Sequence, residues 1–360
     1  MTFVLFLIIL GVLVFVHELG HFIVAKRSGM RVDEFGLGFP PKLLSRKYGE
    51  TEYSLNLIPF GGFVKIFGED SIAEGKVTEG AFTSKKRPLQ AAVLVAGIAC
   101  NLLFAWFLIS IGFMFGLPSP MDARFEGQIQ NPRLSVVSVL PNSPASEAGL
   151  RSGDVILSIA SGGKDFAELL DVDSARAFIG GSEVGMTMSI RHGTEEKNVT
   201  LTPKEGIIPD RKAIGIGLDV IGTLKLSPIP AVIEGARTAY NLSVATVEGL
   251  FGFLRDAVFG KADLSQVTGP VGLAGYVGDA RSLGFVYLLS FTAFISINLA
   301  IINLLPIPAL DGGRLLFVAI EAIRRKAISA KFTERVNTVG FFGLIALMLL
   351  VTYHDVMKLF

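Results

Sequence analysis

Several residue types are scarce in this chain of 360 residues. A single cysteine, Cys100, excludes a disulfide within the chain and any zinc module built from cysteines. Charged residues make up only 18%, below the roughly 25% of an ordinary soluble domain. The 33 basic and 32 acidic residues leave a net charge of +1, which excludes binding to nucleic acid driven by phosphate neutralisation. Apolar residues reach 51%, so we expect a membrane protein with a soluble part.

Four apolar stretches are long enough to cross a bilayer, which takes about 20 residues. They run from 3 to 25, from 89 to 117, from 284 to 305 and from 336 to 352. The first has no basic start and no small-residue cleavage site, so we expect it to be retained and not removed as a signal peptide. Residues 228–260 repeat apolar side chains at helical spacing but also carry charges, which favours an amphipathic helix on the membrane surface.

The basic residues predict the orientation of these spans. Residues 26–88 and 314–335 are rich in Lys and Arg, and both segments are therefore expected to face the cytoplasm. Both chain termini and the segment between the second and third spans then lie outside. Because no Arg- and Ser-rich transit segment is evident, we expect a bacterial inner (plasma) membrane.

The first span contains the pattern HELGH at residues 17–21. His17 and His21 share one face of a helix, where two imidazoles can bind one zinc ion, and Glu18 can act as the general base. Ionisable residues inside a span are costly and usually functional. The simpler interpretation is a polar helix end near the membrane interface. A catalytic zinc site normally has three protein ligands, so a third is required.

A carboxylate at the same depth is the expected third ligand, because the other two histidines lie on the outer side. The third span ends in NLLPIPALDGG at 303–313, where Pro306 and Pro308 break the helix before Asp311. If the chain has four spans, Asp311 lies on the same side of the membrane as the two histidines. If residues 228–260 formed a fifth span, Asp311 would lie on the opposite side. A turn Asp before Gly-Gly is the alternative interpretation.

These two motifs, with TGPVG at 268–272, resemble the site-2 protease family, and most closely its RseP-like bacterial members. These are zinc proteases that cut other proteins inside the membrane, and the resemblance covers essentially the whole chain. It implies that His17, His21 and Asp311 are the zinc ligands and that Glu18 is the catalytic base. It also implies that Asn298 and Asn303 hold the substrate backbone. Hydrogen bonding between helices is the alternative role for the two Asn side chains.

The loop after the first span alternates over 52–57 and 63–67 around a turn at 59–62, which predicts a β-hairpin. It resembles the membrane-associated hairpin of the family, whose edge could pair with an unwound substrate strand. The alternative is a hairpin that only covers the active site.

Residues 131–204 resemble a single PDZ domain on the outer side, which would bind an extended peptide end or would shield the substrate entrance. The predicted fold is therefore a polytopic α-helical membrane protein with four spans, a cytoplasmic β-hairpin and an inserted α+β PDZ domain. Its expected parts are 1–117, 131–204, 228–260 and 284–360.

The predicted function is that of a zinc-dependent intramembrane endopeptidase in regulated intramembrane proteolysis. Its expected partners are the lipid bilayer and single-span membrane proteins, such as anti-sigma factors or remnant signal peptides. A non-catalytic PDZ-containing membrane adaptor or chaperone is the main alternative, and a degraded HExxH motif would favour it. A zinc transporter would need polar residues along a whole path through the bilayer, and only one cytoplasmic-side site is visible.

Overall fold

The structure is a computed structural model that describes residues 2–69, 79–166, 170–182, 185–208, 211–261 and 267–357. The chain forms two compact units. The first consists of Met1–Ile109, Glu234–Gly278 and Phe291–Phe360. The second consists of Ser110–Ile233 and Asp279–Ser290.

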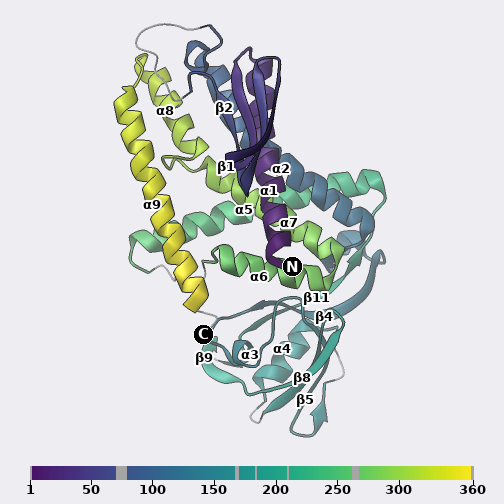
Figure 1. Ribbon diagram of the computed structural model, residues 1–360. Helices are drawn as coiled ribbons and strands as arrows, with labels where there is room; N and C mark the ends of the chain where they lie inside the picture. The colour runs from purple at the N-terminus through teal and green to yellow at the C-terminus, as the bar shows by residue number, and fades with distance from the viewer. Residues whose placement is uncertain are drawn as a thin grey trace. The chain divides into compact units, whose positions relative to one another are not determined.

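Four helices in the described part of the chain are long and apolar enough to cross a membrane (Figure 1). They are α1 (Thr2–Arg27), α2 (Arg87–Phe115), α7 (Phe285–Leu304) and α9 (Ala330–Met357). They coincide with the four stretches predicted from the sequence, so the chain is a membrane-integral protein. The charged helix α5 (Pro228–Val258) is not among them, in agreement with the amphipathic pattern.

Helices α1 and α2 pack at very short range. A Cβ atom added to Gly20 of α1 would lie 2.4 Å from the backbone oxygen of Ala96 and 2.9 Å from Cys100 Sγ, both on α2. Small residues at helix contacts in membranes allow two backbones to approach in this way. Gly20 therefore permits the close contact that brings the polar face of α1 against α2.

The sheet of the first unit differs from the predicted hairpin. It is formed by β1 (Val32–Tyr48) and β2 (Thr51–Ile66), whose turn leaves Tyr48 opposite Thr51. Phe35 lies opposite both Tyr53 and Val64. The two segments predicted to pair with each other, 52–57 and 63–67, are therefore separated by residues 34–37, and that pairing was wrong. Residues 32–48 escaped prediction because Gly36, Gly38 and the Pro40–Pro41 pair interrupt their alternation.

One buried apolar cluster connects this sheet to the helices of the first unit. It contains Ala25, Val32, Ile66, Val93, Leu94 and Val318. These residues come from α1, β1, β2, α2 and α8 (Asp311–Arg324). The cluster fixes α8, whose first residue is Asp311, relative to α1.

The second unit is built on a larger sheet with the strand order β3-β11-β4-β5-β7-β8, and β6 pairs with β5. The strands are β3 (Leu117–Pro120), β4 (Ile129–Val139), β5 (Val155–Ser161), β6 (Lys164–Asp165), β7 (Met186–His192), β8 (Glu195–Leu201) and β11 (Ile216–Leu224). The short strands β9 (Lys204–Ile208) and β10 (Arg211–Ala213) pair separately. The helices of this unit are α3 (Pro144–Glu147) and α4 (Val172–Gly180), together with the end of α6 (Pro270–Leu283) from Asp279 onward. The strands β3 and β11 lie outside the range 131–204 and close the sheet at its base.

The contact at Gly20 gives a test of the packing of α1 on α2. Gly20→Ala should destabilise the protein by about 1–3 kcal/mol, because the new methyl group overlaps a backbone oxygen that cannot move freely. Gly249→Ala on α5 is the matched control, because no atom lies within 4 Å of the added Cβ. Thermal unfolding of the detergent-purified variants measures both. Equal midpoints for the two variants would contradict the close contact.

Candidate metal centre

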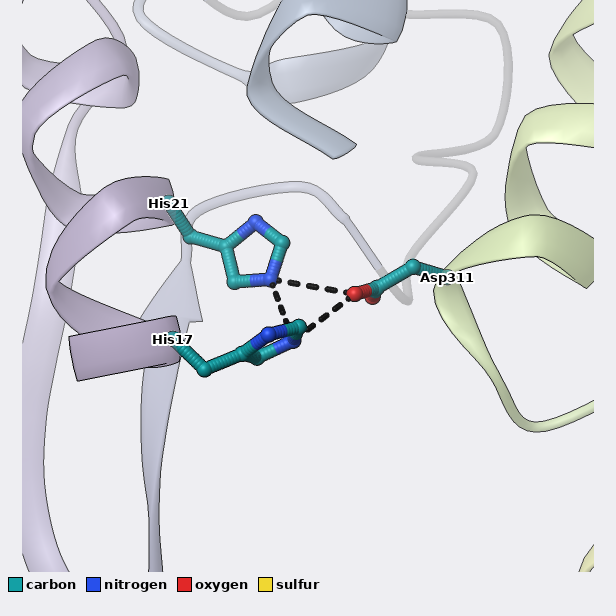
Figure 2. A group of neighbouring side chains, drawn as sticks. All are labelled: His17, His21 and Asp311. Atoms are coloured by element: carbon teal, nitrogen blue, oxygen red, sulfur yellow. Dashed lines mark hydrogen bonds and ion pairs between the residues drawn. The ribbon is translucent and has the colours of Figure 1, made fainter. Parts of the chain in front are cut away.

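Three side chains from distant parts of the sequence converge in the first unit (Figure 2). His17 Nε2 lies 2.9 Å from Asp311 Oδ2 and 3.1 Å from His21 Nε2. His21 Nε2 lies 3.2 Å from the same oxygen of Asp311. Both histidines are only 7% exposed. The structure thus presents two nitrogen atoms and one carboxylate oxygen to a common point, as the sequence predicted for these three residues.

The spacing of these three atoms fits a zinc ion. Tetrahedral zinc with bonds of about 2.0–2.2 Å holds its ligand atoms roughly 3.3 Å apart. The observed separations of 2.9, 3.1 and 3.2 Å are close to that value. A set of two His and one carboxylate is also typical of catalytic zinc sites, which leave the fourth position for water or substrate.

Helix α2 orients the two histidines from the side. His21 Nδ1 lies 2.8 Å from the backbone oxygen of Val93, so this ring nitrogen donates and leaves Nε2 directed toward Asp311. A Cβ atom at Gly97 would lie 2.4 Å from His21 Nε2 and 2.9 Å from His17 Cε1. Only glycine at this position leaves room for both rings.

The residues around Asp311 explain the DGG sequence. A Cβ atom at Gly312 would lie 2.2 Å from the backbone oxygen of Leu305, and one at Gly313 would lie 2.2 Å from that of Ile307. The two glycines therefore allow the start of α8 to pack directly on the loop that follows α7. This compact turn sets the position of the Asp311 carboxylate.

Ion pairs fix α8 farther along its length. Arg87 Nη1, at the start of α2, lies 2.7 Å from Glu321 Oε2, which is largely buried. Arg314 pairs with Glu69, which follows β2. Together with the buried Val318, these contacts hold α8 against the elements that surround α1.

The charge state of Asp311 suits a metal ligand. Burial alone would favour its neutral form, but the interactions with the neighbouring imidazoles of His17 and His21 outweigh this and keep the pKa of Asp311 well below its ordinary value. An ionised carboxylate is the form that coordinates zinc.

The remaining predicted residues lie nearby or on α7. Glu18 is half-buried, and its Cγ would lie 3.7 Å from a Cβ atom added to Gly62 of β2. Asn298 and Asn303 lie on α7, where Asn298 Nδ2 donates to the backbone oxygen of Phe294 at 2.8 Å. No hydrogen bond between either Asn and the three converging residues is found in the described parts of the chain.

Two neighbours of the histidines received no role from the sequence. Gly97 makes room for the rings, and Asn101, which is fully buried on α2, places Nδ2 3.3 Å from His17 Nδ1. The available signal was a polar amide in an otherwise apolar span, where such a group needs a specific partner.

A cluster of two buried histidines and a partly buried aspartate, among helices of membrane-spanning length, is an arrangement typical of a membrane-integral metalloenzyme. The family model described as Peptidase family M50 matches residues 5–347, and the chain belongs to this family. It is therefore a zinc metalloprotease of the site-2 type that functions in regulated intramembrane proteolysis. The predicted family, enzyme class and cofactor are confirmed.

Curated relatives agree over nearly the whole chain. The "Putative zinc metalloprotease CPE1693" of Clostridium perfringens is 38% identical over 351 residues, covering 97% of each chain. The "Regulator of sigma-W protease RasP" of Bacillus subtilis is 31% identical and covers 100% of this chain and 99% of the relative. The "Zinc metalloprotease RasP" of Geobacillus kaustophilus is 30% identical, covering 99% of this chain and 97% of the relative.

The contact at Gly97 predicts the effect of a single methyl group on zinc binding. Gly97→Ala should weaken zinc binding by about tenfold or more, because the methyl group displaces both imidazoles from Asp311. Competition with a chromophoric chelator measures the affinity. Gly343→Ala on α9, where the added Cβ meets no atom within 4 Å, should bind zinc as the wild type does. Unchanged affinity in Gly97→Ala would show that the rings do not depend on this contact.

Proposed function

We propose that His17, His21 and Asp311 bind the catalytic zinc ion and that Glu18 is the general base. The convergence of the two Nε2 atoms and Asp311 Oδ2 within 3.2 Å supports this assignment. Asp311 follows His17 by 294 positions and His21 by 290 positions in the sequence. A metal ion is the simplest reason to gather these groups in an apolar protein interior.

The proposed groups perform different parts of peptide hydrolysis. A zinc ion held by His17, His21 and Asp311 would lower the pKa of a bound water molecule to about 7 and would polarise the scissile carbonyl. The Glu18 carboxylate accepts the proton of the attacking water and passes a proton to the leaving amine. Glu18 follows His17 directly on α1 and is half-buried, so it is close enough to serve the same site without being a ligand.

The substrate is proposed to lie as an extended strand between β2 and α7. Residues 62–66 of β2 pair with residues 32–37 of β1 on one side, and Gly62 lies against Glu18. A strand added to the other side would pass beside the proposed base. Asn298 and Asn303 of α7 can then bind its backbone through their amides.

Single-span membrane proteins are the proposed substrates, because one transmembrane segment can unwind and enter such a site. The name of the Bacillus subtilis relative refers to sigma-W, which favours an anti-sigma factor in that class; remnant signal peptides are the second candidate. The basic segments 26–88 and 314–335 support an inner-membrane orientation with both termini outside and the site toward the cytoplasm.

The sheet of the second unit is proposed to be a PDZ domain on the outer side. Its strands and the helices α3 and α4 form one apolar core that includes Leu134, Ile159, Ala175 and Met188. Because the proposed site faces the cytoplasm, this domain acts on substrate access and not on bond cleavage.

Removing the proton acceptor tests the role of Glu18. Glu18→Gln should retain about one zinc ion per chain, as a four-coordinate site requires, while cleavage falls by about 10²–10⁴-fold, the usual contribution of a general base. Metal analysis and cleavage of a transmembrane model substrate in detergent measure the two effects. Glu248→Gln, the same change at an exposed position of α5, is the control. Wild-type turnover by Glu18→Gln would remove the residue from the mechanism.

The metal ligands require a separate comparison. Asp311→Asn should lose most of its zinc, since it removes the only anionic ligand of the three. If Asp311→Asn keeps the full zinc content, the third ligand is another residue. This conclusion holds whatever the result for Glu18→Gln.

The pairing of β3 with β11 indicates where the proposed PDZ domain can be deleted. Pro120 of β3 lies opposite Ile221 of β11, so a two-residue turn can replace residues 121–220. We expect this deletion to cleave a short, trimmed substrate as the wild type does, and also to cleave an untrimmed substrate that the wild type spares. Co-expression with both forms of one substrate measures this. A zinc-loaded deletion variant that spares the untrimmed form would contradict a role in size selection.

A further inference from the structure

Asn101 lies at the point where three helices meet around His17. Its side chain is fully buried, and its Nδ2 is 3.3 Å from His17 Nδ1. Its backbone oxygen accepts a hydrogen bond of 2.8 Å from the hydroxyl group of Ser296 on α7, which is also fully buried. The amide is thus fixed by its backbone while its side chain faces the imidazole.

The orientation of the Asn101 amide corresponds to one tautomer of His17. An amide Nδ2 can only donate, so His17 Nδ1 accepts in this arrangement. The ring proton then resides on Nε2, which donates to Asp311 Oδ2 at 2.9 Å. Binding of zinc by Nε2 requires the other tautomer, because a nitrogen that coordinates the metal carries no proton.

A second observation concerns the other end of the same amide. Asn101 Oδ1 is buried and has no hydrogen-bond partner within the described residues. A buried amide oxygen without a partner is unfavourable. Rotation of the amide by about 180° brings this oxygen to the position of Nδ2, where it can accept a hydrogen bond from a protonated Nδ1.

We propose that Asn101 is a positioning residue that selects the zinc-binding tautomer of His17 by turning its amide. In the zinc-bound arrangement Asn101 Oδ1 accepts from His17 Nδ1–H, and Nε2 is free to coordinate. The turn exchanges one unpaired amide atom for the other, so the number of hydrogen bonds between Asn101 and His17 is unchanged. His21 needs no such residue, since its Nδ1 already donates to the fixed backbone oxygen of Val93.

The inference depends on a hydrogen-bond acceptor in the side chain at position 101. Substitutions of similar size distinguish the effect of this acceptor from the effect of side-chain shape. Asn101→Asp keeps an oxygen acceptor and removes the donor, whereas Asn101→Leu keeps the approximate volume and removes both. We expect Asn101→Leu to weaken zinc binding by about 10–100-fold, as loss of a hydrogen bond behind a ligand does, and Asn101→Asp to stay within a few-fold of the wild type.

The measurement is the zinc affinity of the full-length protein in detergent, by competition with a chromophoric chelator. The absorption spectrum of the cobalt-substituted protein reports ligand geometry independently of cleavage, and it should change in Asn101→Leu and not in Asn101→Asp. Ser290→Ala on the same helix α7 is the control, because its hydroxyl group donates to the backbone oxygen of Val286 and not to Asn101; it should bind zinc as the wild type does.

Several results would overturn the proposal. Wild-type affinity in Asn101→Leu would do so, as would equal weakening in Asn101→Asp and Asn101→Leu, because shape alone would then account for the effect. If Asn101→Asp does not fold, Asn101→Thr and Asn101→Val form a second pair with and without an acceptor. Tighter zinc binding by the Thr variant supports the proposal, and equal binding contradicts it.

The proposal rests on His17 as a zinc ligand, and His17→Ala separates the two assignments. If His17→Ala binds zinc as the wild type does, the ligand assignment itself fails. If His17→Ala loses zinc while Asn101→Leu retains full affinity, the ligand assignment stands and only the role of Asn101 is wrong.

Discussion

The contact of α1 with α2 is the constraint on which the rest of the first unit depends. Gly20 lets the two backbones approach, and Gly97 leaves the space that the imidazoles occupy. At this separation the backbone oxygen of Val93 and the amide of Asn101 are both within reach of the rings. A larger separation would remove these two hydrogen-bond partners from the Nδ1 atoms of the rings, which is costly in an apolar environment.

The third member of the cluster comes from a different kind of structure. Asp311 begins α8, and it is held by a loop packed against two glycines and by ion pairs at Arg87 and Arg314. The histidines are thus placed by contact between helices, whereas the carboxylate is placed by a turn and by charges. The cluster thus has its two imidazole nitrogens on one rigid element and its carboxylate oxygen on another.

The sequence predicted the parts of this architecture that repeat with a period or carry a motif. The four spans follow from continuous apolar runs, and HELGH and the Pro-broken DGG segment indicated the three converging residues. The pairing of the sheet was mispredicted, because the residues at 34–37 that separate the two segments contain glycine and lack clear alternation. Asn101 was not assigned, since a single amide in an apolar helix shows that a partner is needed but not which residue provides it.

The sheet of the second unit begins and ends at one place. Leu117 of β3 lies opposite Leu224 of β11, and the backbone nitrogen of Leu226 donates to the oxygen of Phe113 at 2.9 Å. The chain thus returns to the end of α2 after β11. Insertions between β3 and β11 therefore leave the length and register of the flanking helices unchanged. A closed base of this kind lets evolution lengthen or exchange the domain without remodelling the membrane helices.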